Sequence, residues 1–276
     1  MKKKILLVMI ILVGLVTCNG IVNNYRVVTT TYDIKSNKVE SDYTFVQISD
    51  YHSQTSDSEK ILNITETSKP DYILLSGDIL EASDMSETLK FVEDLMGISP
   101  VIYARGNHED DYNTYQEFQS KLKEMGVIVL NSNNYLVDDL NFVGIEDFSG
   151  ASLNYNDSFN SEYIPYIEDH QQLINDEKYN VLLAHRPNYL DTYASINADL
   201  VVSGHAHGGQ WQIPFTNIGI IAPDEGLFPT HVEGLGQQGE TYQAISAGTS
   251  NPYQPVVPRL FNPKEVVVIN VKAIEE

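Results

Sequence analysis

The sequence predicts an α/β fold in which two mixed β-sheets pack face to face, with helices on their outer faces. In the first half, short apolar segments of buried-strand type alternate with segments of helical spacing. In the second half, strand-like segments are joined by Asn-rich or Asp-rich turns, and helices are fewer. With 276 residues, the chain can bury a full core without disulfide bonds.

The first half reads as β-α-β-α-β-α. Residues 43–49 alternate between apolar and polar and are rich in β-branched and aromatic side chains, which is typical of a strand. Residues 84–96 carry apolar side chains at helical spacing, and Gly97 follows them. The expected strands are 43–49, 71–76 and 101–103, and the expected helices are 58–69, 84–96 and 112–125.

The second half predicts more strands than helices. Residues 149–160 are rich in Ser and Asn and predict an exposed loop, which together with residues 224–238 is expected to shape a pocket. We predict a single domain over 43–276. Its further strands are expected at 127–130, 135–137, 141–145, 179–184, 199–203, 241–246 and 265–271, with helices at 164–174 and after Pro187.

The charge of the chain excludes one class of partner. Asp and Glu number 38 against 17 Lys and Arg, which gives a net charge of −21. Such a surface repels the phosphates of nucleic acids and anionic lipid headgroups, so we expect no nucleic-acid groove. The main effect of this acidity is to keep the domain soluble.

Residues 1–18 predict an export signal. Three lysines precede an apolar run over 5–16, which is short for a spanning helix of roughly 20 residues. Residues 15–18 resemble a bacterial lipobox that ends in Cys18, although Thr17 stands where Gly, Ala or Ser is usual. The alternative is an uncleaved signal anchor that extends through Val22. A buried N-terminal helix is disfavoured because the run has no polar face.

Both interpretations of the N-terminus tether the domain to the outer face of a bacterial cell membrane, with the N-terminus itself cytoplasmic. Residues 19–42 are polar, with few large apolar side chains, and predict a spacer between the anchor and the domain. Because Cys18 is the only cysteine, the exported domain would hold no thiol, which suits an oxidising exterior.

Five short segments carry metal-binding side chains, each just after an apolar run. Taken singly, each could be a strand-end histidine, a helix cap or a turn; taken together, they predict one site, because ligands gather beyond the carboxyl ends of strands in α/β sheets. With a single cysteine, the site would use nitrogen and oxygen donors. The candidate ligands are Asp50, His52, Asp78, Asn107, His185, His205 and His207.

The motifs Asp-x-His, Gly-Asp, Gly-Asn-His-Glu, His and Gly-His-x-His, in that order, resemble those of the calcineurin-like metallophosphoesterase superfamily. The resemblance covers about residues 44–271 and implies a four-layer αββα sandwich. Residues 204–210, 226–229 and 259–263 resemble a bacterial membrane-associated branch, which is related to UDP-2,3-diacylglucosamine pyrophosphatases and cell-wall phosphoesterases.

The resemblance also implies roles for the candidate residues. One metal ion would be held by Asp50, His52 and His207, and the other by Asn107, His185 and His205, with Asp78 bridging the two. His108 would be the catalytic residue that contacts the phosphoryl oxygen and protonates or steadies the leaving oxygen. Glu81 would orient His108 or else face solvent. Arg105 would neutralise a phosphate oxygen or else form a structural salt bridge.

The implied activity is phosphohydrolysis by in-line attack of a hydroxide that bridges two divalent metals. The mixed His, Asp and Asn donors favour Mn²⁺, Fe or Zn²⁺ over Mg²⁺. The substrate would be a phosphorylated small molecule, a nucleotide sugar or an envelope component. One alternative is a pyrophosphatase of the UDP-2,3-diacylglucosamine type, and another is a non-catalytic metal-binding or solute-binding lipoprotein. A protein phosphatase is disfavoured, because residues 77–81 lack that branch's downstream Asp-Arg pair.

We expect activity to fall in mild acid. Histidine binds a metal only when it is neutral, so protons compete with the metal below a pH of about 6.5. Metal content and hydrolysis rate, measured together across the pH range, should fall together. A rate that falls while the metal stays bound would contradict this explanation.

Overall fold

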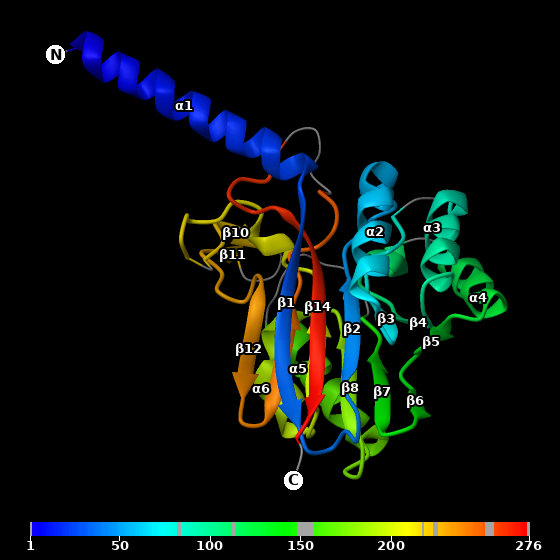
Figure 1. The fold of residues 1–276 in the computed structure, drawn as a ribbon. Helices are drawn as coiled ribbons and strands as arrows, with labels where there is room; N and C mark the ends of the chain where they lie inside the picture. Colours follow the sequence, from blue (N-terminus) through cyan, green and yellow to red (C-terminus); the bar gives the residue numbers. More distant parts are fainter. Residues whose placement is uncertain are drawn as a thin grey trace.

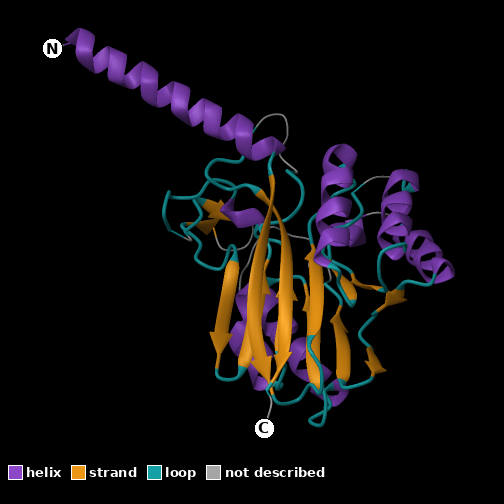
Figure 2. Cartoon of the chain, viewed as in Figure 1, coloured by secondary structure: helices purple, strands orange, loops and turns teal. Residues whose placement is uncertain are grey.

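The computed structural model describes residues 2–81, 84–111, 114–147, 157–216, 218–222, 226–251 and 257–274. Two six-stranded sheets form its centre (Figures 1 and 2). The first sheet has the order β1 (Val27–Ser36), β14 (Lys264–Ala273), β2 (Tyr43–Ile48), β3 (Tyr72–Ser76), β4 (Val101–Ala104) and β5 (Ile128–Val129). The second has the order β12 (Gly234–Gln238), β13 (Thr241–Ile245), β9 (Leu200–Ser203), β8 (Tyr179–Ala184), β7 (Leu140–Ile145) and β6 (Asn134–Val137).

Helices lie outside the two sheets, and a small antiparallel pair stands apart from them (Figure 1). The helices are α1 (Lys2–Tyr25), α2 (Ser58–Ser68), α3 (Ser86–Met96), α4 (Tyr115–Met125), α5 (Asp157–Asp169) and α6 (Leu190–Ser195). The 3₁₀ helices are η1 (Thr55–Asp57), η2 (His108–Asp111), η3 (His170–Leu173), η4 (Pro187–Tyr189) and η5 (His207–Gly209). The small pair consists of β10 (Ile221–Ala222) and β11 (Gly226–Leu227).

The alternation of side chains along each strand produces the layers. In β3, Ile73 and Leu75 point to the core formed with α2, α3 and α4, whereas Leu74 points to the core between the sheets. Apolar side chains of β7, β8 and β9 divide in the same way between that central core and a third core under α5 and α6. These three cores confirm the predicted four-layer αββα arrangement.

Parallel pairing brings the functional loops to one edge. Strands β2, β3 and β4 run parallel in the first sheet, as do β7, β8 and β9 in the second. The carboxyl ends of parallel strands lie at the same edge of their sheet. The loops that follow β2, β3 and β4 can therefore meet the loops that follow β8 and β9.

The N-terminal segment differs from the prediction in two ways. Helix α1 continues past the apolar run to Tyr25, and its apolar side chains are exposed; it is long and apolar enough to cross a membrane. Residues 27–36, expected to belong to a polar spacer, instead form β1, which pairs along its whole length with β14. As an edge strand, β1 buries only one side chain, so its polar composition concealed it. The domain limits themselves stay a prediction.

Two pocket-shaping loops were predicted. Residues 149–156 of the first, predicted over 149–160, lie outside the described residues, and α5 begins at Asp157. In the second, residues 224–225 lie outside the described residues, and the remainder contributes β11 and β12. The prediction placed the start of this helix at residue 164, seven residues later than α5 begins.

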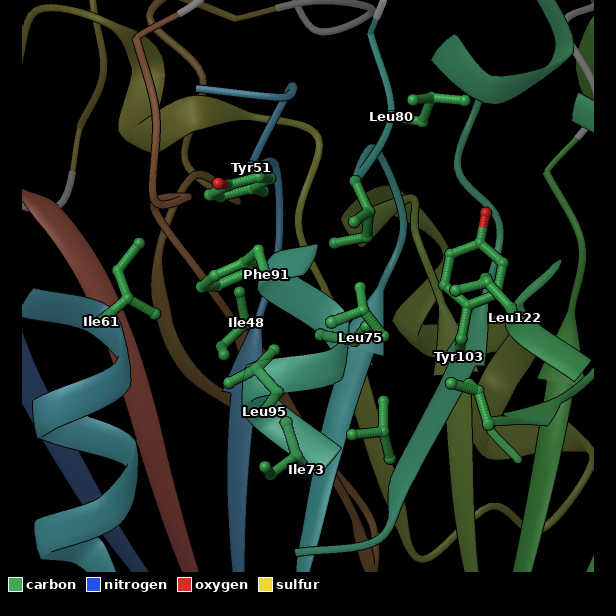
Figure 3. Close-up of a cluster of buried hydrophobic side chains, with 14 of the residues drawn as sticks. Ile48, Tyr51, Ile61, Ile73, Leu75, Leu80, Phe91, Leu95, Tyr103 and Leu122 are labelled. Atoms are coloured by element: carbon green, nitrogen blue, oxygen red, sulfur yellow. The ribbon is translucent and has the colours of Figure 1, made fainter. Parts of the chain in front are cut away.

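Stacking of Tyr51 on Phe91 fixes the first functional loop to the core beneath it. The two ring centroids lie 4.2 Å apart with a 7° angle between the planes, and both side chains are buried beside Ile48 and Leu75 (Figure 3). Because Tyr51 lies between two candidate ligands, its packing determines where their backbone sits.

Replacement of Phe91 by Ala should lower the free energy of unfolding by about 3–5 kcal/mol, because it leaves a cavity under Tyr51. Leu136→Ala is the matched control, since Leu136 is 53 % exposed and Phe91 is 2 % exposed. Chemical denaturation of the full chain in detergent would measure both variants. Equal midpoints would contradict the packing argument.

Candidate metal centre

The candidate ligands lie just beyond the carboxyl ends of five strands. In the first sheet, Asp50, Asp78 and Asn107 follow β2, β3 and β4. In the second sheet, His185 directly follows β8 and His205 follows β9. The structure therefore brings together side chains that are up to 157 residues apart in the sequence, as from Asp50 to His207.

The first donor group combines Asp50, His52 and His207, all buried. Nε2 of His52 lies 3.3 Å from Nε2 of His207. Oδ1 of Asp50 lies 3.4 Å from Nε2 of His207 and 3.9 Å from Nε2 of His52. Three donor atoms at such distances surround a space of the size that one metal ion fills.

The second donor group combines Asp78, His185 and His205, also buried. Oδ2 of Asp78 lies 3.0 Å from Nε2 of His185 and 3.8 Å from Nε2 of His52, which belongs to the first group. The carboxylate of Asp78 thus lies between the two groups. Oδ1 of Asp78 accepts a hydrogen bond from the backbone N–H of His108.

Several donor atoms in these groups suit cations rather than hydrogen bonds. Among the described residues, Oδ2 of Asp78, Nε2 of His185 and Oδ1 of Asn107 are buried and make no well-aligned hydrogen bond. Nδ1 of His185 lies 2.8 Å from the carbonyl oxygen of Ser76, which places its proton there and leaves Nε2 with a lone pair. Buried polar atoms of this kind are costly unless a ligand satisfies them. The donor set therefore fits divalent metal ions.

The pKa shifts of Asp78 and His185 show that the site attracts positive charge. Burial opposes the charged form of Asp78, yet His185 outweighs it and holds the pKa of Asp78 well below its usual range. Burial likewise disfavours protonated His185, but the neighbouring Asp78 raises the pKa of His185 well above its usual value. The carboxylates thus attract positive charge, which protons or metal ions can supply.

Close backbone approach makes room for this arrangement. A Cβ atom on Gly106 would lie 2.2 Å from Oδ1 of Asp78, and one on Gly204 would lie 2.2 Å from Oδ2 of Asp50. Any larger residue would push the carboxylates away. Five candidate ligands hold left-handed backbone conformations, which are uncommon outside glycine: Asp50, His52, Asp78, His205 and His207.

Glu109 is a functional residue to which the sequence argument gave no role. It is fully buried, and its carboxylate accepts hydrogen bonds from the backbone N–H groups of Asp78, Leu80 and Gly106 at 3.0, 3.1 and 2.8 Å, and from that of Ile79. Burial and the charge of Asp78 raise the pKa of Glu109 above its usual value. Glu109 therefore ties the loop after β3 to the loop after β4. In the sequence, the only indication of this role is that Glu109 directly follows Asn107 and His108.

Arg259 and Asn262 brace the other side of the site. The guanidinium of Arg259 is fully buried and donates hydrogen bonds to the carbonyl oxygens of Ala247 and Ser250 and to Oδ1 of Asn262. The amide of Asn262 then donates to the carbonyl oxygen of His207 at 2.7 Å. The segment 259–263 had been singled out only as a resemblance. In the structure it positions the backbone of His207.

Glu81 and His108 lie beside the first donor group. One carboxylate oxygen of Glu81 is 2.7 Å from Nδ1 of His52, and the other is 3.5 Å from Nδ1 of His108. Burial opposes protonation of His108, but Glu81 and the charge of Asp78 raise the pKa of His108 to about 9. The same contacts lower the pKa of Glu81 to about 2, against the effect of burial. The His108 side chain is 34 % exposed, so a substrate can reach it.

Arg105 has structural partners. Its Nε lies 3.4 Å from Oε1 of Glu146, and its guanidinium lies 5.2 Å from the ring centroid of Tyr115. Of the two roles weighed for Arg105, these contacts support the structural salt bridge. They orient the guanidinium toward these two side chains.

Comparisons with known proteins agree with this geometry. The family described as Calcineurin-like phosphoesterase matches residues 43–209. An uncharacterized metallophosphoesterase of Campylobacter jejuni is 26 % identical over 246 residues, which are 87 % of this chain and 62 % of that protein. The metallophosphoesterase YkuE of Bacillus subtilis is 26 % identical over 260 residues, which are 90 % of this chain and 87 % of that protein.

Among solved structures, protein TT1561 of Thermus thermophilus superposes with a TM-score of 0.51 at 12 % identity. The superposition covers 75 % of this chain and 89 % of that one, and at this identity it supports the fold alone. The family match covers more than half of the chain and includes all the candidate ligands. The chain therefore belongs to the calcineurin-like phosphoesterase family, and with it to the metal-dependent phosphoester hydrolases.

Proposed function

We propose that this protein is a phosphohydrolase with two divalent metal ions, which cleaves phosphoester or pyrophosphate bonds. One observation carries the proposal: the buried carboxylate of Asp78 lies between two donor groups, 3.0 Å from His185 and 3.8 Å from His52. A carboxylate has two oxygens and can bridge two cations, and hydrolases of phosphoesters commonly use such pairs.

The proposed ligands follow the two groups. Asp50, His52 and His207 hold one ion, Asn107, His185 and His205 hold the other, and Asp78 bridges them. When bound, the ions would polarise the phosphoryl group and supply a nucleophile at neutral pH. Mn²⁺, Fe and Zn²⁺ suit this mixed donor set.

The remaining residues position the substrate and move a proton. His108 contacts the phosphoryl oxygen, and its partly exposed imidazole, protonated because of Glu81, donates a proton to the leaving oxygen. Glu81 orients both His52 and His108 through its two oxygens. Glu109 is a positioning residue, since it holds the backbone of both loops and faces no substrate.

The substrate is proposed to be a phosphorylated small molecule, a nucleotide sugar or an envelope component outside the cytoplasm. Helix α1 supports a membrane tether, either as a signal anchor or as a signal that ends in lipidated Cys18. The alternative is a pyrophosphatase of the UDP-2,3-diacylglucosamine type. The substrate of such an enzyme is cytoplasmic, so a catalytic site on the outer face of the membrane would not meet it. Protease accessibility of the domain in intact cells decides between them.

Replacement of His108 by Ala should leave the metal content unchanged and lower turnover by about 10²–10⁴-fold, the usual contribution of a positioned acid or base. Purified variants would be compared by metal analysis and by a screen against aryl monoesters, aryl diesters and nucleotide sugars. His231→Ala is the matched control, because His231 is exposed and lies outside both donor groups. Full activity of the His108 variant would refute the catalytic role of His108, and metal binding without turnover in the parent protein would favour the non-catalytic metal-binding alternative.

Replacement of Asp78 by Ala should remove most of the bound metal and all measurable activity, because both ions lose a shared ligand. Asp94→Ala, an exposed carboxylate on α3, should keep the metal content and rate of the parent protein. Elemental analysis after dialysis measures the metal, and circular dichroism establishes that both variants are folded. Two equivalents of metal retained by the Asp78 variant would refute the bridging role.

A further inference from the structure

The anchor helix joins the domain at the edge that carries the metal centre. Helix α1 ends at Tyr25 and β1 begins at Val27. Strand β1 runs parallel to β14, and β14 runs antiparallel to β2. The start of β1 and the carboxyl end of β2, which leads to Asp50, therefore lie at the same end of the sheet (Figure 1).

Hydrogen bonds and packing contacts hold the last turns of α1 against the domain. Oδ1 of Asn24 accepts a hydrogen bond from Asn251 at 2.6 Å, and Oδ1 of Asn19 accepts one from the backbone of Phe261 at 2.7 Å. A Cβ atom on Gly20 would lie 3.0 Å from Leu260, so the helix and this loop touch directly. The orientation of α1 relative to the metal centre is thus set by contacts rather than by a loose linker.

An apolar surface surrounds this junction, and we name it the aromatic surface. More than half of the exposed large apolar side chains that the described residues hold outside α1 belong to it. Hydrogen bonds connect its parts, from Trp211 to Pro258, from Ile220 to Trp211 and from Phe228 to Ile220. It consists of Trp211, Phe215, Ile221, Leu227, Phe228 and Phe261.

The charge of this region differs from that of the rest of the chain. Within 211–232, the sequence has charged side chains only at Asp224 and Glu225, which lie outside the described residues, although the net charge of the protein is −21. Trp and Phe are side chains that concentrate at the level of lipid headgroups. The described residues of this region are therefore suited to contact a bilayer by apolar burial.

The length of α1 is compatible with such contact. Residues 5–22 span about 27 Å as a helix, close to the roughly 30 Å of hydrocarbon in a bilayer. Ile21, near the end of this stretch, lines a cavity of about 370 Å³ together with Val16, Pro258 and Leu260. A bilayer that covers Ile21 must also reach the domain surface beside it. Helix α1 leans out over the side that carries β10 and β11 (Figure 1).

We propose that the aromatic surface rests in the headgroup layer of the membrane that holds α1, so that the metal centre takes its phosphoester from a membrane amphiphile. The phosphate of such a substrate lies at headgroup depth, at the end of the domain where the candidate ligands gather. The substrate class rests on the proposed phosphohydrolase function, whereas the bilayer contact does not.

Trp211 is the only tryptophan of the chain and reports this contact directly. The full chain is reconstituted into phosphatidylcholine vesicles with or without bromine atoms on the acyl chains, since bromine quenches a neighbouring indole. Bromolipids should quench Trp211, most strongly when the bromine is close to the headgroup. Unchanged fluorescence overturns the proposal. Shielding from aqueous acrylamide without bromolipid quenching also overturns it, because a second copy of the chain would then cover the surface.

A second reporter serves as the matched control. Leu136 is exposed on β6 and lies beside Asn141, near the start of β7, at the end of the sheet away from the metal centre. The double variant Trp211→Phe, Leu136→Trp should show no bromolipid quenching. Equal quenching of the two reporters overturns the proposed orientation, because the domain would then contact the vesicle at random.

The substrate class has its own test. The double variant Phe215→Ser, Ile221→Ser should hydrolyse a long-chain phosphodiester embedded in vesicles at least about tenfold more slowly, because it loses the burial of two large apolar side chains. Its rate on a water-soluble aryl phosphodiester should equal that of the parent. Equal rates on the vesicle substrate overturn the substrate class. If the parent hydrolyses neither substrate, the phosphohydrolase function fails, and Trp211 quenching alone decides the bilayer contact.

Discussion

The buried carboxylate of Asp78 is the constraint on which the rest of the structure depends. It belongs to the first sheet, yet Nε2 of His185, from the second sheet, lies 3.0 Å from it. A charged carboxylate without water is costly unless positive charge compensates it. The two sheets pack face to face, and their parallel strands end at the same edge, so both sheets can supply groups that compensate the charge. The site therefore depends on the four-layer packing that holds these edges together.

Three buried side chains support the loops of the site, mainly through hydrogen bonds to the backbone. Glu109 accepts hydrogen bonds from N–H groups of the loops after β3 and β4, while Arg259 and Asn262 hold the loop that bears His207. The loop braced by Arg259 also touches the last turns of α1, so the anchor and the metal centre share one support.

The sequence was sufficient for the strands that carry the site, because buried parallel strands have apolar runs with an abrupt polar end. It also singled out seven candidate ligands, and six of them lie in two neighbouring donor groups. It missed β1, because all of its side chains but one are exposed or half-exposed, and its residues therefore lack the apolar pattern of a buried strand. It could not assign Glu109 or Arg259, since a side chain that binds backbone groups leaves no spacing pattern. The positive φ angles of Asp50 and Asp78 were equally invisible in residue types.

Those positive φ angles affect the stability that the loops would have without bound metal ions. Each left-handed non-glycine residue costs of order 1–2 kcal/mol, and the effect recurs at five neighbouring positions. The loops hold this strain beside the buried carboxylates of Asp50 and Asp78. Bound cations would compensate these carboxylates and hold the loops in place, so a chelated sample would begin to unfold at these loops while the sheets below remain intact. The temperature at which these loops unfold would then measure how much of the site is occupied by ions.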